Sequence, residues 1–297
     1  MSAAQIVSTT PSAPGSKRRP PRTAYLLLLL PLLWLFLFFV IPLVSLIATS
    51  LYDPAGSLET GYAMTGHVQN YLSVLGDYRS HIFRSFAYAA AATIACVVLG
   101  YPLAYAIAFK SGRWKNLMLV AVIAPFFTSF LIRTLSWQLL LGDQAWFAEA
   151  LRAVNLLGPD GHLLATPFAV ITGLTYNFLP FMVLPLYTSL EKVDPRLMEA
   201  GSDLYASPFT TFRKVTLPLS MPGLVAGTLL TFIPAAGDYI NAELLGNPRT
   251  QMIGNVIQNL FEAGSYPEAS ALSVTLMAVI VVMVLFYIRR AGTEELL

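Results

Sequence analysis

Six long apolar segments alternate with polar segments along the chain, and they cover residues 25–50, 83–109, 117–141, 167–190, 219–245 and 269–288. An α-helix needs roughly 20 apolar residues to cross the hydrocarbon core of a bilayer. Backbone polar groups in lipid must be satisfied within the protein, which restricts spanning segments to helices or closed barrels. The length of these segments therefore predicts an all-α membrane protein with six transmembrane helices.

The composition supports this interpretation, since the chain is 56% hydrophobic and only 11% charged. Soluble domains carry about 25% charged residues, so an ordinary soluble protein is excluded. The single cysteine, Cys96, lies inside an apolar segment. A lone thiol forms no internal disulfide, and we interpret it as a small packing residue.

The two ends of the chain differ from its apolar middle. The first apolar segment is too long for the h-region of a signal peptide, which spans roughly 7–15 residues, so we expect it to remain as the first span. Residues 1–24 are rich in Ser, Thr, Pro and Ala and are predicted to form a disordered cytoplasmic tail. A transmembrane domain of residues 25–288 and a C-terminal tail of residues 289–297 complete the expected organisation.

Lysine and arginine are concentrated in alternate polar segments, which predicts the orientation of the chain. Most of them lie before the first span, after the second, between the fourth and fifth, and after the sixth: Lys17, Arg18, Arg19, Arg22, Lys110, Arg113, Lys115, Lys192, Arg196, Arg213, Lys214, Arg289 and Arg290. Both termini and the 191–218 loop are therefore expected on the cytoplasmic side. The loops on the opposite side are rich in acidic residues. These are either ordinary solvated loop residues, or they attract cations or a docking partner electrostatically. The three histidines on that side are far apart, and their spacing predicts no metal site.

The polar stretch between the fourth and fifth apolar segments contains two signals for the start of a helix. Asp194-Pro195 and Ser207-Pro208 each place a capping residue before a proline at the first helical position. We expect a short helix to about Ala206 and a second one that ends at Pro218. Such an ordered loop is interpreted as a docking surface, or alternatively as a connector that contacts anionic lipid headgroups.

The residues EAGSDLYASPFTTFRKVTLPLSMPG, 199–223, resemble the EAA loop of the membrane subunits of ABC importers. The resemblance implies a type I ABC importer permease fold, in which the 191–223 loop contains a cytoplasmic coupling helix held in a cleft of a separate ATPase. It places these residues at the ATPase contact: Glu199, Ala200, Asp203, Tyr205, Ala206, Phe209 and Phe212. Gly201 stands where a second alanine is usual, and Tyr205 where a glycine is usual. Tyrosine adopts a positive φ only at a steric cost, so the geometry of this turn is left open.

The chain has no G-x-x-x-x-G-K-[ST] phosphate loop and no Gly-Lys pair. We therefore expect a transport subunit rather than an enzyme. The subunit itself is expected to bind no cofactor or metal, and a partner ATPase is expected to bind ATP and Mg. The resemblance implies a second homologous permease subunit, two cytoplasmic ABC ATPase subunits and an extracytoplasmic substrate-binding protein. The expected location is the bacterial cytoplasmic membrane, in contact with lipid and with no nucleic-acid partner.

Three further stretches resemble the spermidine/putrescine permeases, and they fit the B-type subunit of that pair best. They are PFFTSFLIRTLSWQLLL (125–141), IPAAGDYINAELLG (233–246) and IGNVI (253–257). The resemblance implies polyamines as the cargo. Related importers of other solutes, such as amino-acid derivatives, opines or ferric ion, share part of this pattern and remain the alternative.

Asp238 and Glu243 are the acidic residues inside the fifth apolar segment, and Tyr239 lies between them. A charge at mid-membrane costs about 2.5–3.5 kcal/mol, so such residues tend to face a pore or a partner. On one helix the two carboxylates would be about 7.5 Å apart along the axis, which is of the order of the amine spacing in a polyamine, and Tyr239 could add a cation–π contact. Alternatively, Glu243 is merely interfacial and Asp238 forms a structural ion pair with Arg133.

Several other residues are candidates for the substrate pathway. Trp137 either lines the entrance or belongs to the interfacial aromatic belt, and Tyr176 and Asn177 either line the pore or join neighbouring helices. Arg133 is expected to be a structural intramembrane cation, bonded to carbonyls or carboxylates. Helix kinks, which often surround substrate paths, are expected at these residues: Pro180, Pro185, Pro234 and Gly237.

Two functions of other classes compete with an ABC importer. An ion-coupled secondary carrier that works alone would need inverted repeats, which the two halves of the chain do not show, and would leave the 191–223 loop without a purpose. An enzyme that acts on lipid would need a nucleophile and a base, but no histidine lies near the interior of a span and G-x-S-x-G is absent.

Overall fold

A computed structural model describes residues 22–57, 59–158 and 160–291. The chain divides into two compact units, Met1–Leu46 and Ile47–Leu297. The predicted tail of residues 1–24 lies almost entirely outside the described residues, and so do residues 292–297 of the C-terminal tail.

The first apolar segment forms one helical run, from α1 (Arg22–Leu35) through a π-helical turn, η1 (Phe36–Val40), to α2 (Ile41–Thr49). The wide π turn ends two residues before Pro42, which has no backbone N–H to donate. Residues Leu27–Thr49 have a mean hydropathy of 2.9, and most of their side chains are exposed, with none buried. An exposed apolar helix of this length suits a lipid environment, as predicted for the first span.

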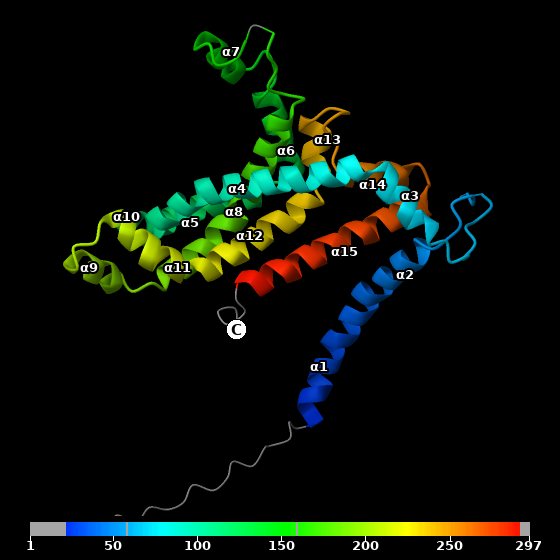
Figure 1. Cartoon of the computed structure of the whole chain (residues 1–297), viewed down its shortest axis with the longest axis horizontal. Coiled ribbons are helices and arrows are strands. Elements are labelled where there is room, and N and C mark those ends of the chain that lie inside the picture. The colour runs from blue at the N-terminus through cyan, green and yellow to red at the C-terminus, as the bar shows by residue number, and fades with distance from the viewer. Residues whose placement is uncertain (1–21, 58, 159, 292–297) are drawn as a thin grey trace, which may run out of the picture. The chain divides into compact units, whose positions relative to one another are not determined.

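Three long helices form the core of the second unit: α4 (Arg79–Phe109), α8 (Pro167–Glu191) and α12 (Met221–Ala236). They pack lengthwise against one another (Figure 1). Two buried apolar clusters fill the space between them, one around Leu174 and Phe178 and the other around Met182 and Leu186. Both clusters lie on α8, which is therefore the central helix of the bundle.

Two of the predicted spans are not straight helices. In the third, the helical stretches Gly112–Phe127 and Phe130–Leu140 meet at 95°, because the chain is extended at Thr128 and Ser129. The fifth is interrupted after α12, where residues 237–239 leave the helix before α13 (Ile240–Leu245) begins. A second bend, of 66°, lies between the helical stretches Pro208–Leu219 and Met221–Ala236. Among the described residues, four helices alone are long and apolar enough to span a membrane, and up to six if each of these two bent pairs counts as one span.

The fourth and sixth predicted spans are continuous helices. α8 remains one helix through Pro180 and Pro185, so neither proline breaks the helix, and the sixth span is α15 (Tyr266–Ala291). Short helices outside the spans were not predicted, because apolar length does not mark them: α3 (Gln69–Asp77), α7 (Trp146–Ala153) and α14 (Ile253–Glu262).

Candidate functional site

Four buried polar side chains meet where α6 (Phe130–Leu140), α8 and the break in the fifth span come together. They are Thr134, Asn177, Asp238 and Asn241, which we call the polar cluster, and each is at most 9% exposed. Asn177 Nδ2 donates to Thr134 Oγ1 and to Asn241 Oδ1, both at 3.1 Å. Asn177 Oδ1 is buried and accepts no hydrogen bond from the described residues. The polar cluster therefore contains one hydrogen-bond acceptor that no described donor uses.

Asp238 lies at the break between α12 and α13. Its Oδ1 accepts hydrogen bonds from the backbone N–H of Asn241 at 2.8 Å and from Asn241 Nδ2 at 3.2 Å. The carboxylate thus satisfies a donor at the start of α13 that would otherwise be unpaired. The alternative of an Arg133–Asp238 ion pair is wrong, since Asp238 bonds to its own helix start and no ion pair of Arg133 occurs among the described residues.

Tyr239 and Glu243 lie at the same break, and their side chains are on the surface of the described chain. Tyr239 is 41% exposed and Glu243 is exposed. Asn255 Nδ2 of α14 donates to the Tyr239 carbonyl oxygen and to Glu243 Oε2, both at 3.0 Å. The expected 7.5 Å rise between Asp238 and Glu243 along one helix is wrong, because Asp238 precedes the helix that carries Glu243. Residue type alone did not mark Asn255, although it lies in the IGNVI stretch.

Gly254 packs directly against the break, and we predict that it tolerates no side chain. A Cβ atom there would lie 2.8 Å from the Gly237 carbonyl oxygen and 3.0 Å from that of Asp238. Backbone atoms cannot move aside cheaply, so Gly254→Ala should destabilise the protein by about 1–3 kcal/mol, the usual range for overpacking. Gly76→Ala on α3 is the matched control, because nothing lies within 4 Å of its Cβ position.

The thermal unfolding midpoint of the purified variants measures this difference. Gly254→Ala should lower the midpoint, whereas Gly76→Ala should leave it equal or slightly higher, since alanine is the better helix former. Equal midpoints for the two variants would show that the break does not depend on close contact with α14.

Trp137 and Tyr176 lie beside the polar cluster on α6 and α8. Their rings make an edge-to-face contact with centroids 5.4 Å apart. Both residues line a recess of about 400 Å³, together with Arg133, Thr128 and others. The recess therefore joins the aromatic pathway candidates to the buried arginine.

Arg133 does not have the surroundings expected from the sequence. It is buried, with 8% of its surface exposed. Its guanidinium carbon lies 5.8 Å from the ring centroid of Phe126 and 5.7 Å from that of Phe130. Nε and Nη1 are buried and have no hydrogen-bond partner among the described residues, so the expected bonds to carbonyls or carboxylates are absent at these two atoms.

The 191–223 loop contains the two helix starts that were predicted. α9 (Pro195–Asp203) and α10 (Pro208–Thr211) begin at the two prolines, and Ser207 Oγ accepts a hydrogen bond from the Thr210 N–H at 3.2 Å. Pro218 was predicted to end the second helix, but helical structure continues through η4 (Phe212–Thr216) and α11 (Leu217–Leu219). Pro218 has no N–H to donate to the helical run, and the π-helical turn η4 ends two residues before it.

Most of the predicted ATPase-contact residues are on the surface of the loop. Tyr205 is 99% exposed and Phe209 is 71% exposed. Ala206 is half-buried, and three more of these residues are exposed: Glu199, Ala200 and Asp203. Phe212 instead packs edge-to-face on Tyr101 of α4, with ring centroids 5.4 Å apart. Phe212 therefore anchors the loop to the bundle.

The structure accounts for both departures from the usual loop pattern. Gly201 makes room for Thr211, whose Oγ1 would lie 2.9 Å from a Cβ atom at position 201. Tyr205 has φ of +56°, which is the left-handed conformation that favours glycine. The glycine-type turn is thus kept, with a tyrosine in it.

We predict that Tyr205→Gly stabilises the protein relative to Tyr205→Ala. Both variants remove a side chain that is almost fully exposed, but only glycine escapes the left-handed cost of about 1–2 kcal/mol. The thermal unfolding midpoint should therefore be higher for Tyr205→Gly. Identical midpoints would mean that the turn stores no strain.

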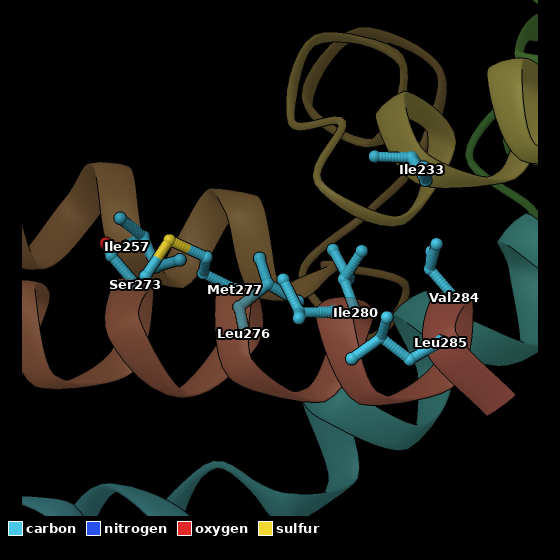
Figure 2. A pocket seen from close by; sticks show the side chains of 9 residues that line it. Ile233, Ile257, Ser273, Leu276, Met277, Ile280, Val284 and Leu285 are labelled. Carbon is cyan, nitrogen blue, oxygen red and sulfur yellow. The ribbon is translucent and has the colours of Figure 1, made fainter. Parts of the chain in front are cut away.

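An apolar recess of about 510 Å³ lies along α15 and does not suit a charged solute. Figure 2 shows Met277 and Ile280 of α15 among the residues that line it, with Ile257 of α14 beside Ser273 at one end and Ile233 of α12 across from α15. Its lining has no charged side chain. In a bilayer such a surface suits acyl chains or another apolar helix.

Comparison with known proteins gives three likenesses. Residues 22–291 match the family described as binding-protein-dependent transport system inner membrane component. The chain is 38% identical over 260 residues to the spermidine/putrescine transport system permease protein PotB of Escherichia coli (strain K12), covering 86% of this chain and 93% of that protein. It is 36% identical over 258 residues to PotB of Haemophilus influenzae (strain ATCC 51907 / DSM 11121 / KW20 / Rd), covering 86% and 90%.

One solved structure extends this likeness to the fold. A chain of a bacterial ABC transporter involved in the import of the acidic polysaccharide alginate superposes with a TM-score of 0.67 at 16% identity. The match covers 92% of this chain and 96% of that chain.

Proposed function

This chain belongs to the family of binding-protein-dependent transport system inner membrane components, and on that premise we propose that it carries polyamines such as spermidine and putrescine into the cell. It is a multi-pass inner-membrane permease subunit with the ABC importer permease fold, as the sequence predicted. A permease of this family is a transport subunit rather than an enzyme. Its cargo, its orientation and its ATP-hydrolysing partner are the parts that we propose.

The observation that carries the cargo proposal is the set of acceptors at the break in the fifth span. Asp238 and Glu243 supply carboxylates, and Asn177 Oδ1 supplies a buried acceptor without a partner among the described residues. An ammonium group has three donors and no acceptor, so a polyamine needs such a lining. Its methylene links would pass along aromatic faces, and two exposed or half-buried rings could provide these: Tyr239, which follows Asp238, and Trp137, which contacts Tyr176.

We propose that α8 and α12 transmit motion from the ATPase to this site. α8 carries Asn177 and ends at Glu191, where the 191–223 loop begins. α12 starts at Met221, in the last residues of that loop, and ends at the break, about 24 Å further along its axis. Displacement of α9 by two closing ATPases would therefore act on α8, which carries Asn177, and on α12, which ends just before Asp238.

The proposed orientation places the 191–223 loop and its ATPase partner in the cytoplasm. Lys115 at the start of α5 (Lys115–Ile123) pairs with Glu191 at 2.6 Å, and further basic residues follow in the loop itself. A surface pair of this kind adds little to stability, because water screens both charges. The excess of Lys and Arg at this end is what supports the cytoplasmic assignment.

Uptake of labelled spermidine and putrescine tests the cargo proposal. Cells that lack this chain should lose ATP-dependent uptake of at least one of the two, and expression of the chain should restore it. The same cells should take up an unrelated amino acid at the normal rate. Unchanged uptake of both polyamines in the deletion strain would contradict the proposed cargo.

A further inference from the structure

Arg133 is a buried cation that the described chain leaves without hydrogen bonds at two of its nitrogens. The residue is 8% exposed, and both Nε and Nη1 are buried and unpartnered. The rings of Phe126 and Phe130 lie against the guanidinium, but a ring face does not replace a hydrogen-bond acceptor for each N–H. A buried charge without an acceptor is strongly unfavourable.

Among the described residues, no carboxylate of this chain pairs with Arg133. The acidic residues inside the predicted apolar segments are Asp238 and Glu243. Asp238 Oδ1 accepts from Asn241, and Glu243 Oε2 accepts from Asn255. The three ion pairs among the described residues all lie elsewhere. The described chain thus supplies no carboxylate partner for Arg133.

Arg133 can be reached from outside the chain through the recess of about 400 Å³ that it lines with Thr128, Ser136 and Tyr176. The recess lies beside the middle of the spanning helix α8. Thr134, the next residue, is hydrogen-bonded to Asn177, which is about 15 Å along α8 from its start at Pro167 and about 21 Å from its end at Glu191. Lipid phosphates lie at the membrane surface, too far from this depth to be the partner.

We propose that an acidic side chain from a spanning helix of the second permease subunit enters this recess and pairs with Arg133. A carboxylate matches the planar guanidinium in charge and in hydrogen-bonding geometry. The inference rests on the proposed function, because it requires a second permease subunit. It adds that the two subunits recognise each other through a buried ion pair, next to the pathway residues Trp137 and Tyr176.

The test measures how much of the second permease subunit co-purifies with a tagged form of this chain from membranes that contain the whole complex. Arg133→Glu should reduce the ratio of the two subunits at least tenfold, since two carboxylates would then face each other. In that background, each intramembrane acidic residue of the second subunit is changed to arginine in turn. One of these changes should restore the ratio to at least half of the unaltered value.

A control separates pairing from folding of this chain. Arg133→Met is expressed without the second subunit and should accumulate in the membrane to the same level as the unaltered chain. A lower level would assign Arg133 to internal stability and overturn the proposal. An unchanged subunit ratio for Arg133→Glu, or no restoring change in the second subunit, would overturn it too.

This readout is independent of the cargo. If the deletion strain takes up both polyamines normally but the charge exchange restores association of the subunits, the ion pair is supported and the proposed cargo is wrong. If no second permease subunit co-purifies with the unaltered chain, both the heteromeric assembly and the ion pair are wrong.

Discussion

Asp238→Asn should lower the initial rate of spermidine uptake by roughly ten- to a hundredfold, with the amount of protein in the membrane unchanged. The asparagine Oδ1 can still accept both hydrogen bonds that Asn241 donates to Asp238, so the start of α13 keeps its geometry. What is lost is a charged acceptor for an ammonium group, worth about 1.5–3 kcal/mol, and each factor of ten corresponds to about 1.4 kcal/mol.

Two further variants show whether this loss belongs to the site. Glu243→Gln keeps an acceptor for Asn255 and should also reduce spermidine uptake, although less, because Glu243 is exposed and Asp238 is buried. Glu262→Gln on α14 removes an exposed carboxylate that contacts Gln258 and should leave uptake normal. Full uptake with Asp238→Asn would mean that this carboxylate is purely structural.

Glu199→Arg should abolish ATP hydrolysis that depends on substrate-loaded binding protein, while the chain remains in the membrane. Glu199 is exposed on α9, and it forms no ion pair with another described residue. Its replacement therefore breaks no ion pair within the described part of the subunit. Reversing a charge inside an interface typically costs about 2–5 kcal/mol, which corresponds to at least about thirtyfold weaker coupling. The measurement is the ATPase rate of the purified complex with and without loaded binding protein.

Glu199→Gln is the matched variant, since it keeps the length and polarity of the side chain without the charge. It should retain more stimulated hydrolysis than Glu199→Arg. The same rate for Glu199→Arg as for the unaltered complex would refute a role of α9 in coupling.

Apolar segment length was a sufficient guide to the long helices. The predicted spans 83–109 and 167–190 correspond to α4 and α8 within a few residues, because a stretch that crosses hydrocarbon has few conformations available other than a helix. The starts of α9 and α10 were also predictable, since Asp194-Pro195 and Ser207-Pro208 are local signals that need no tertiary information.

The breaks could not be located in the same way. The stretch around Thr128 lies inside a long apolar segment, yet it bends by 95°, and Pro180 and Pro185 do not break α8. Helices in a bundle recover the hydrogen bonds that proline removes through their neighbours, so a proline in the sequence does not decide where a span ends. Packing decides instead, as the contact of Gly254 with the backbone of Gly237 illustrates.

The polar cluster was only partly foreseeable. Asn177 and Asp238 stood out as polar residues inside apolar segments, whereas Thr134 and Asn241 did not, because a threonine or an asparagine in a span usually bonds locally or across helices. Their meeting depends on the bend in the third span and the break in the fifth. Tertiary structure therefore added the network, and the sequence had indicated its charged member.

Transport by the reconstituted complex is the most direct measurement of the central claim that this permease moves polyamines under the control of an ATPase held at α9. Proteoliposomes that contain the complex and ATP, with binding protein and labelled spermidine on the opposite side, should accumulate spermidine. Accumulation should stop when ATP is omitted and when Glu199→Arg replaces the unaltered chain. Accumulation without ATP, or none with ATP while another solute is taken up, would contradict the account.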